Sequence, residues 1–340
     1  MVRNETTGTN ETIVFDEPKS VTIEDRERPT PDADEVLIRT ERTLVSTGTE
    51  LTVLSGEYPD GSYWDEHASY PFEPGYNNVG EIVAVGDEVT DLEVGQRVGT
   101  YGPHAAYTVA SANHCRPIPD GVDNDEAAFF TIAEIVMNGV RRSELTWGET
   151  AAVYGLGLLG QLAVQCCHVA GARPVIAADL ASSRLEYVPN GTGIETFDSS
   201  ARDPETAVRE ASNDRLADVV FEVTGNPAAI TDELDVLRNQ GRFVVLSSPR
   251  GETQFDFHDF CNGPSYRIIG AHNSSHPSVA TPENPWTQHR HAELFFDLVE
   301  DGELSVDHLV SHRADYTDAA GIYGTLLEDR SEAMGVLLEW

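Results

Sequence analysis

The stretch AAVYGLGLLGQLAVQCCHVAGARPVIAAD, at residues 151–179, carries the strongest indication of the fold of this chain. A short apolar run leads into Gly-x-Gly-x-x-Gly at residues 155–160, a helical pattern follows, and a second apolar run ends at Asp179. Apolar runs that alternate with a helical pattern in this way predict a strand, a helix and a second, parallel strand.

The glycine spacing predicts a dinucleotide site at the turn between this first strand and the helix. Gly155 permits a tight turn, Gly157 lets the backbone approach a diphosphate, and Gly160 lets the helix pack close to its strand. Asp179 follows at the distance where an acidic residue accepts hydrogen bonds from ribose hydroxyls. Residues expected to contact the cofactor from this region are Gly155, Gly157, Leu158, Leu159, Gly160, Asp179 and Arg184.

Length and charge bound the class of protein. At 340 residues the chain suits two domains, and its formal net charge is −36, with Lys19 as its single lysine. A charge of this size repels itself unless salt screens it, so we expect an acidic surface of the halophilic kind, adapted to a salt-rich cytoplasm. The acidic residues form no terminal tail that would suit a basic partner, and nucleic acid is not an expected partner.

No apolar run is long enough to span a membrane, and the polar residues 1–10 do not resemble a signal peptide. A cytoplasmic protein is therefore expected. The four cysteines have no Cys-x-x-Cys spacing, so neither a disulfide nor a cysteine-rich zinc site is predicted.

The chain changes character near residue 123. Residues 1–122 carry short β-branched runs separated by turn signals, a pattern typical of a small β-barrel. From there strands and helices alternate, which predicts a doubly wound parallel sheet. Ligands of such sheets lie at the carboxyl ends of the strands. This adds four expected cofactor contacts, namely Thr224, Gly225, Ser247 and Ser248.

Several further segments are similar to those of one enzyme family. They are Pro74–Glu81 with Val85-Gly86, Val94–Val98, Ile118–Gly121, Glu126–Ala128, Glu222–Gly225 and Gly241–Val245. With the glycine motif, they make the chain resemble the medium-chain dehydrogenase/reductase superfamily, which contains the zinc-type alcohol dehydrogenases. The resemblance implies an α/β fold with a GroES-like β-barrel catalytic domain, from residues 1–122 and 266–340, around a Rossmann cofactor domain at 123–265.

The resemblance fails at the catalytic zinc ligands. Where zinc-dependent members carry a cysteine, this chain has Thr47, and where they carry His-Glu it has Tyr76-Asn77. The third ligand position falls near Thr131. Because a catalytic zinc site needs three protein ligands, we expect no metal and a zinc-independent enzyme. An alternative keeps zinc through unaligned residues such as His104, His114 or Cys115.

The same resemblance suggests catalytic and substrate-binding residues. Thr49 falls at the position of the hydroxyl that relays the proton, Tyr76 could donate to a carbonyl oxygen, and Glu50 could orient a neighbour. A structural role, with local hydrogen bonds or simple packing, is the alternative for each. Candidate substrate contacts are Thr47, Asn77, His272 and Trp286.

These observations predict an NAD(P)-dependent oxidoreductase that interconverts an alcohol and a carbonyl, with sugars or polyols as the favoured substrates. Asp179 would repel a 2′-phosphate and favours NAD, whereas Arg184 could admit NADP. Quinone or enone reduction with NADPH is one alternative, and a dinucleotide-binding sensor without turnover is another. The family resemblance also implies a homodimer or homotetramer.

Overall fold

The computed structural model describes residues 8–340, and the contacts within it divide the chain into two compact units. One unit runs to Thr131 and resumes at Ala292, and the other spans Ile132–His291. The boundaries expected from the sequence, at 122/123 and 265/266, differ from these. The strand expected at 266–271 was assigned to the returning catalytic domain, but in the structure it is hydrogen-bonded into the parallel sheet of the second unit.

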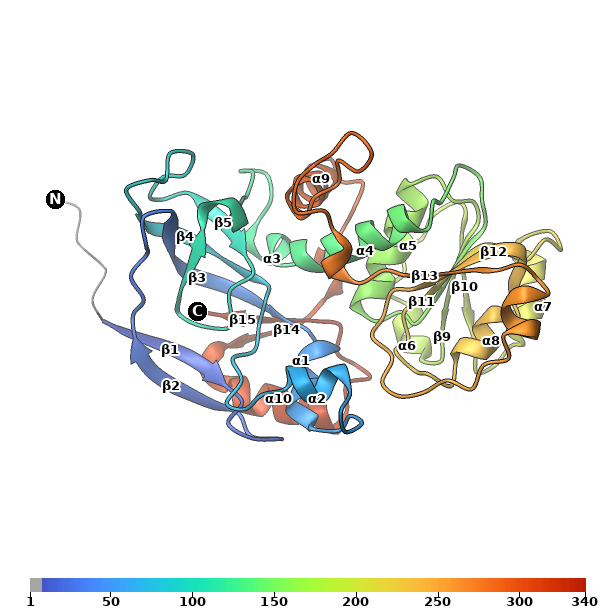
Figure 1. Ribbon diagram of the computed structural model, residues 1–340, viewed down its shortest axis with the longest axis horizontal. Helices are drawn as coiled ribbons and strands as arrows, with labels where there is room; N and C mark the ends of the chain where they lie inside the picture. Colours follow the sequence, from blue (N-terminus) through green and yellow to red (C-terminus); the bar gives the residue numbers. More distant parts are fainter. Residues whose placement is uncertain (1–7) are drawn as a thin grey trace. The chain divides into compact units, whose positions relative to one another are not determined.

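The second unit contains a six-stranded parallel sheet with helices on both sides (Figure 1). Its strand order is β10-β9-β8-β11-β12-β13, the doubly wound arrangement that the sequence predicts. The central strands β8 and β9 are buried at every position because helices cover both faces of the sheet. The elements that lie in this unit are α4 (Phe130–Arg142, from Ile132 on), β8 (Ala151–Tyr154), α5 (Leu158–Val169), β9 (Val175–Asp179), α6 (Ser182–Leu185), β10 (Ile194–Asp198), α7 (Pro204–Ala211), β11 (Ala217–Glu222), α8 (Ile230–Leu234), β12 (Leu237–Val245) and β13 (Arg267–Gly270).

The first unit is built on a mostly antiparallel sheet of order β14-β15-β3-β4-β5-β7, in which β6 also pairs with β3. A separate two-stranded ribbon, β1-β2, precedes it in the chain (Figure 1). The strands are β1 (Thr9–Val14), β2 (Thr22–Glu27), β3 (Glu35–Val45), β4 (Asn78–Val85), β5 (Arg97–Thr100), β6 (Tyr107–Ser111), β7 (Arg116–Pro117), β14 (Val310–Asp315) and β15 (Gly335–Glu339). The helices are α1 (Thr49–Ser55), α2 (Tyr63–His67), α3 (Asn124–Ala127), α9 (Gln288–Glu300, from Ala292 on) and α10 (Ala319–Glu328).

The core of the first unit explains where its candidate site lies. Helices α1 and α10 pack together, and Phe15, Leu54, Tyr323 and Leu338 are wholly buried in one apolar cluster. The first turn of α1 and one face of α10 are thereby fixed against the sheet. The apolar C-terminal segment forms β15, which pairs with β3.

None of the helices among residues 8–340 is both long and apolar enough to cross a membrane.

Candidate active site

The glycine loop of the second unit has the geometry that its sequence predicts. Gly155 has φ +91°, and a β-carbon there would lie 2.7 Å from the backbone nitrogen of Thr224. A β-carbon on Gly160 would lie 1.9 Å from the carbonyl oxygen of Gly155. At Gly157, by contrast, an added β-carbon would meet no protein atom within 4 Å. Two glycines are therefore needed for packing, and the third leaves open space beside the backbone.

Helix α5 begins directly after this open position, with Gly157 as its N-cap and Leu158 and Leu159 in its first turn. The first N–H groups of a helix have no partner within it, and they carry the positive end of the helix dipole. The loop and the helix start thus fit the diphosphate of a dinucleotide cofactor.

Asp179 ends β9 beside this loop and is 8% exposed. One carboxylate oxygen accepts from the Leu156 backbone N–H at 2.6 Å, and the other accepts from the Ala181 N–H at 2.8 Å. A guanidinium nitrogen of Arg184 lies 3.7 Å from the same carboxylate. Asp179 therefore shapes the loop, and its remaining lone pairs are available for ribose hydroxyls.

The carboxyl ends of β11 and β12 are joined by Glu222, a residue that the sequence reasoning missed. Its buried carboxylate accepts from the Thr224 hydroxyl at 2.7 Å, from the Gly225 N–H at 2.8 Å and from the Ser247 hydroxyl. Three of the four predicted cofactor contacts at this edge are thus held by one carboxylate, while Ser248 is exposed. An acidic residue at the end of an otherwise apolar strand was the available signal.

A second buried carboxylate, Glu233 of α8, lies near Glu222. It is 2% exposed, and neither of its oxygens has a hydrogen-bond partner among residues 8–340. Burial, then the charges of Glu222 and Asp232, raise the pKa of Glu233 to about 9. Glu233 is therefore protonated at neutral pH, and its neutral form avoids electrostatic repulsion with Glu222.

The first unit brings together the predicted residues Tyr76 and Thr49. The phenolic oxygen of Tyr76 lies 2.6 Å from the Ser46 hydroxyl and 3.4 Å from the Thr49 hydroxyl. The Thr131 hydroxyl donates to the backbone carbonyl of Tyr76 at 3.0 Å, which fixes the ring's position. Burial raises the pKa of Tyr76, so its phenol keeps its proton. The cluster contains hydroxyl groups and no metal ligand.

Glu50, the third catalytic candidate, lies beneath this cluster and is 1% exposed. It accepts hydrogen bonds from the Ser46 N–H at 2.9 Å, from the imidazole Nε2 of His104 at 3.1 Å and from the Tyr323 hydroxyl. Burial, followed by the charge of Glu50, raises the pKa of Tyr323 well above its ordinary value. Glu50 thus orients the backbone that carries Ser46. His104 and Tyr323 are its partners, and neither has a local sequence motif.

The four predicted substrate contacts lie in different surroundings. Thr47 is partly buried before α1, and its carbonyl accepts from Arg330. Asn77 is wholly buried, and its amide donates to the Leu44 carbonyl at 3.2 Å, which favours a structural role. His272 is exposed after β13, whereas Trp286 is covered by arginine side chains described below.

The residues at the family's zinc positions do not fit a zinc ion. Thr47, Tyr76, Asn77 and Thr131 supply hydroxyl and amide groups, whereas catalytic zinc takes imidazole, thiolate or carboxylate ligands. The proposed reaction therefore contains no zinc-dependent step.

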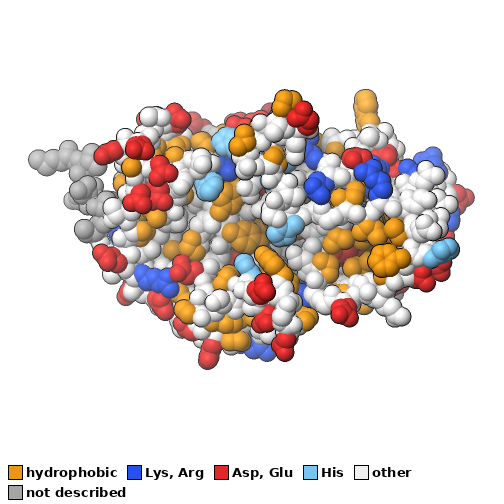
Figure 2. Space-filling model, in the orientation of Figure 1, with side chains coloured by type: hydrophobic (Ala, Val, Ile, Leu, Met, Phe, Trp, Pro, Cys, Tyr) orange, Lys and Arg blue, Asp and Glu red, His pale blue; other side chains and the backbone are white. Residues whose placement is uncertain are grey.

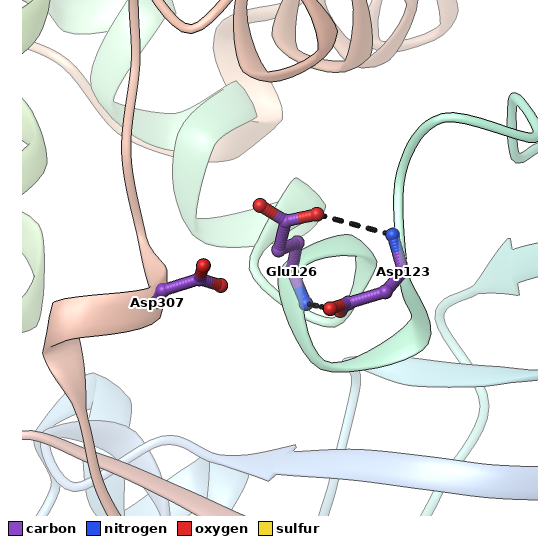
Figure 3. Close-up of side chains that lie close together, drawn as sticks. All are labelled: Asp123, Glu126 and Asp307. Carbon is purple, nitrogen blue, oxygen red and sulfur yellow. Dashed lines mark hydrogen bonds between the residues drawn. The ribbon is translucent and has the colours of Figure 1, made fainter.

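Across residues 8–340, one trio of acidic, histidine or cysteine side chains is close enough to share a metal ion: Asp123, Glu126 and Asp307 (Figure 3). Asp123 and Glu126 are already used in a reciprocal capping box at the start of α3. Burial, together with the nearby Asp307 and Asp123, raises the pKa of Glu126. Their positions are thus explained by the helix cap.

The alternative zinc ligands His104, His114 and Cys115 are not brought together as a metal site among the described residues. His104 is wholly buried and bonded to Glu50. Cys115 is 2% exposed, and burial raises the pKa of its thiol to about 12, which opposes formation of a thiolate ligand. Within the described part of the chain, the one trio with ligand atoms within 4.8 Å of one another contains neither these two residues nor His114.

Comparisons with known proteins agree with this architecture. Residues 32–156 match the family model of the alcohol dehydrogenase GroES-like domain, and residues 159–283 match that of the zinc-binding dehydrogenases. L-galactonate-5-dehydrogenase of Escherichia coli K12 is 26% identical over 361 residues, which cover 97% of this chain and 99% of that protein. Sorbitol dehydrogenase of Bacillus subtilis 168 is 28% identical and covers 65% of this chain and 70% of that protein.

A crystal structure of a protein from Sinorhizobium meliloti 1021, bound to NADP, superposes with a TM-score of 0.81. It is 22% identical and covers 98% of this chain and 100% of that one, a likeness that shows the fold. With two family models in succession and a cofactor loop of matching geometry, the chain belongs to the medium-chain dehydrogenase/reductase superfamily, as an NAD(P)-dependent oxidoreductase.

Proposed function

We propose that this enzyme is a zinc-independent dehydrogenase that oxidises a secondary hydroxyl group of a sugar, polyol or sugar acid with NAD. The observation that carries the proposal is the hydroxyl cluster of Tyr76, Ser46 and Thr49, in which Tyr76 stands at one of the family's zinc-ligand positions. The substrate class rests on the relatives, which include an L-galactonate-5-dehydrogenase and a sorbitol dehydrogenase.

The second unit would hold the cofactor through two features. The first turn of α5 would bind the diphosphate, and Asp179 would accept hydrogen bonds from the ribose. The nicotinamide, when bound, supplies the hydride acceptor. The preference for NAD rests on Asp179, whose carboxylate repels a 2′-phosphate. Arg184 is engaged with that carboxylate, which weakens the case for Arg184 as a phosphate ligand.

In the first unit, Tyr76 would bind and orient the substrate oxygen. Its raised pKa keeps the phenol protonated, so it can donate a hydrogen bond to a carbonyl oxygen or exchange a proton with an alcohol. In alcohol oxidation, the alcohol's proton would pass to the Tyr76 oxygen as the phenol's own proton moves through the Ser46 or Thr49 hydroxyl to solvent water, and carbonyl reduction would reverse this transfer. Glu50 acts on this step indirectly, because it fixes the backbone N–H of Ser46.

The proposal is tested by nicotinamide absorbance in molar KCl. NAD and NADP are offered with polyols, sugars and sugar acids, and NADH and NADPH with ketones and enones. The expected result is reduction of NAD by at least one polyhydroxylated substrate. Oxidation of NADPH by enones alone would replace the dehydrogenase with an enone reductase, and tight NAD binding with no turnover across the panel would favour a sensor.

A further inference from the structure

The loop that follows β13 carries Trp286, and two arginine side chains lie over its indole ring. The guanidinium carbon of Arg141 is 3.0 Å from the ring centroid, and that of Arg290 is 3.8 Å from it. Arg141 belongs to the last turn of α4, and Arg290 belongs to the first turn of α9. All three residues lie in the second unit. Two like charges are thus held on one aromatic platform.

Neither guanidinium has an acidic partner. Six of the other ten arginines of this unit lie within 4 Å of a carboxylate, namely Arg184, Arg202, Arg209, Arg238, Arg242 and Arg267, whereas Arg142, Arg173, Arg215 and Arg250 form no such pair among the described residues. Within residues 8–340, Arg141 and Arg290 form no such ion pair. Arg141 and Arg290 are distinguished from the other unpaired arginines because both guanidinium groups lie over one indole ring, in a chain with 58 acidic residues against 22 lysines and arginines.

The surroundings of the pair are uniformly basic or neutral. Burial, and then the charge of Arg290, lower the pKa of Arg141 to about 10. Burial, and then His276 and the two arginines, lower the pKa of His291 to about 3. No carboxylate contributes to either shift, and only the Cys166 thiol opposes the lowering of the Arg141 pKa. The local potential is therefore positive, although the whole chain is strongly negative.

A directed chain of hydrogen bonds holds Arg141 in place. Its Nε–H must donate to His291 Nε2, 3.0 Å away, and the carbonyl oxygen of Asn273 must accept from His276 Nδ1, 2.8 Å away. The intervening bond, 2.9 Å long, therefore runs from His291 Nδ1–H to His276 Nε2. Both imidazoles are neutral, so the positive charge resides on the two guanidinium groups. Among the described residues, the Arg141 side chain is hydrogen-bonded through Nε alone, so its terminal amino groups can donate to a ligand.

We propose that Arg141 and Arg290, on the Trp286 platform, form a binding site for a phosphoryl group. Guanidinium groups present forked donors that match phosphate oxygens, and two of them balance a dianion. The acidic surface elsewhere repels anions, so a phosphate is attracted here only at short range. The phosphate can be free inorganic phosphate or the headgroup of a phosphorylated metabolite. This site is independent of the proposed dehydrogenase reaction.

The test is calorimetric titration of the full chain at fixed KCl concentration. The probes are inorganic phosphate and glycerol 1-phosphate, and the reference compounds are glycerol and acetate. We expect saturable binding of one phosphate or phosphomonoester per chain. Arg141→Gln and Arg290→Gln should each weaken it roughly tenfold or more, because each removes charge-assisted hydrogen bonds. If glycerol 1-phosphate binds much more tightly than phosphate, the ligand is a metabolite; equal affinity identifies the free ion.

Arg142→Gln is the matched control, because Arg142 is the neighbouring arginine and its Nε donates to the Gly270 carbonyl instead. It should leave phosphate affinity unchanged. The thermal unfolding temperature identifies any variant that fails to fold, and Trp286→Phe then replaces it, since phenylalanine keeps a smaller platform. The proposal is wrong if no saturable binding is found. It is equally wrong if binding survives intact in the Arg141→Gln Arg290→Gln double variant, which would assign the phosphate to another site such as the glycine loop.

Discussion

At the scale of single residues, the proposed chemistry depends on Tyr76. The resemblance to zinc-dependent enzymes places a metal-bound histidine at this position. Here the phenol of Tyr76 is hydrogen-bonded to Ser46, and the backbone carbonyl of Tyr76 accepts a hydrogen bond from Thr131. A neutral phenol can polarise a carbonyl by hydrogen bonding, although it lacks the charge of a metal ion. The enzyme should therefore rely on orientation and proton exchange.

Tyr76→Phe should lower kcat roughly a hundredfold, because it removes the only group at this position that can exchange a proton. KM for NAD should change little. The assay is steady-state reduction of NAD with the best substrate of the panel. Tyr63→Phe, an exposed tyrosine of α2, is the control and should leave kcat unchanged. Wild-type kcat in Tyr76→Phe would remove Tyr76 from the mechanism.

Glu233→Gln should stabilise the protein increasingly as pH rises. The folded-state pKa of Glu233, about 9, lies above its ordinary value of 4.5, so between these values the folded state holds a proton that the unfolded state has lost. Stability is then lost with rising pH until the folded group ionises near pH 9, by at most about 1.4 kcal/mol per pH unit.

Urea unfolding of wild type and Glu233→Gln at several pH values between the two pKa values measures this effect. The difference in free energy of unfolding should grow with pH, and the exposed Glu88→Gln should show no such growth. A difference that does not depend on pH would mean that Glu233 is already ionised in the folded protein.

At the scale of elements, different glycines of the loop serve helix packing and cofactor binding. Gly160 brings α5 against the backbone of Gly155, whereas Gly157 leaves room beside the loop. Gly157 also has φ −69° and ψ −170°, a conformation that alanine adopts without strain. The two positions therefore make opposite predictions for the same substitution.

Gly160→Ala should destabilise the second unit by roughly 2 kcal/mol or more, because its β-carbon would overlap a backbone oxygen. Gly157→Ala should cost less than about 1 kcal/mol yet weaken NAD binding roughly tenfold or more, because its methyl group occupies the space for the diphosphate. Thermal unfolding and NAD titration measure the two effects. Equal NAD affinity in Gly157→Ala and wild type would show that the diphosphate lies elsewhere.

The elements that the sequence predicts are those with a strong local pattern. The strand, helix and strand around the glycine loop lie where the apolar runs predict them. The pattern from Pro227 to Arg238 predicts a helix, but this prediction is wrong at its end, because α8 stops at Leu234 and β12 begins at Leu237. The charged strand β2 was not predicted from the sequence. Its side chains are largely exposed, so its sequence lacks the alternation of apolar and polar residues that identifies a half-buried strand. Helix α7 was missed although Asp203 caps it and Pro204 begins it, a readable start signal.

The candidate sites follow the same division. The glycine loop and Asp179 could be read from spacing, because one local segment supplies both. Glu50, His104 and Tyr323 meet only through long-range packing of α1 and α10, so no sequence spacing predicts their contact. The parallel pairing of β13 with β12 is likewise a property of the folded sheet, which is why the expected domain boundary fell before it.

At the scale of the whole molecule, net charge is the dominant feature. Acidic side chains are scattered over the visible face instead of forming one patch (Figure 2). At a net charge of −36, their mutual repulsion acts against the folded state and is screened by salt.

The thermal unfolding temperature should therefore rise when KCl is increased from about 0.1 M to about 1 M, where the screening length falls from roughly 10 Å to 3 Å. Differential scanning calorimetry at constant pH measures the change. Most of the gain should come below about 1 M, since further salt adds little screening. An unfolding temperature that stays constant or falls would show that repulsion does not limit stability.

We propose that the hydroxyl cluster of Tyr76, Ser46 and Thr49, and no zinc ion, exchanges the substrate proton when NAD accepts the hydride. The most direct test measures NAD reduction by the best polyhydroxylated substrate before and after treatment with a zinc chelator, with metal content determined on the same samples. We predict equal rates and far less than one zinc ion per chain in both samples. Loss of activity with the chelator and its recovery on adding zinc would contradict the account.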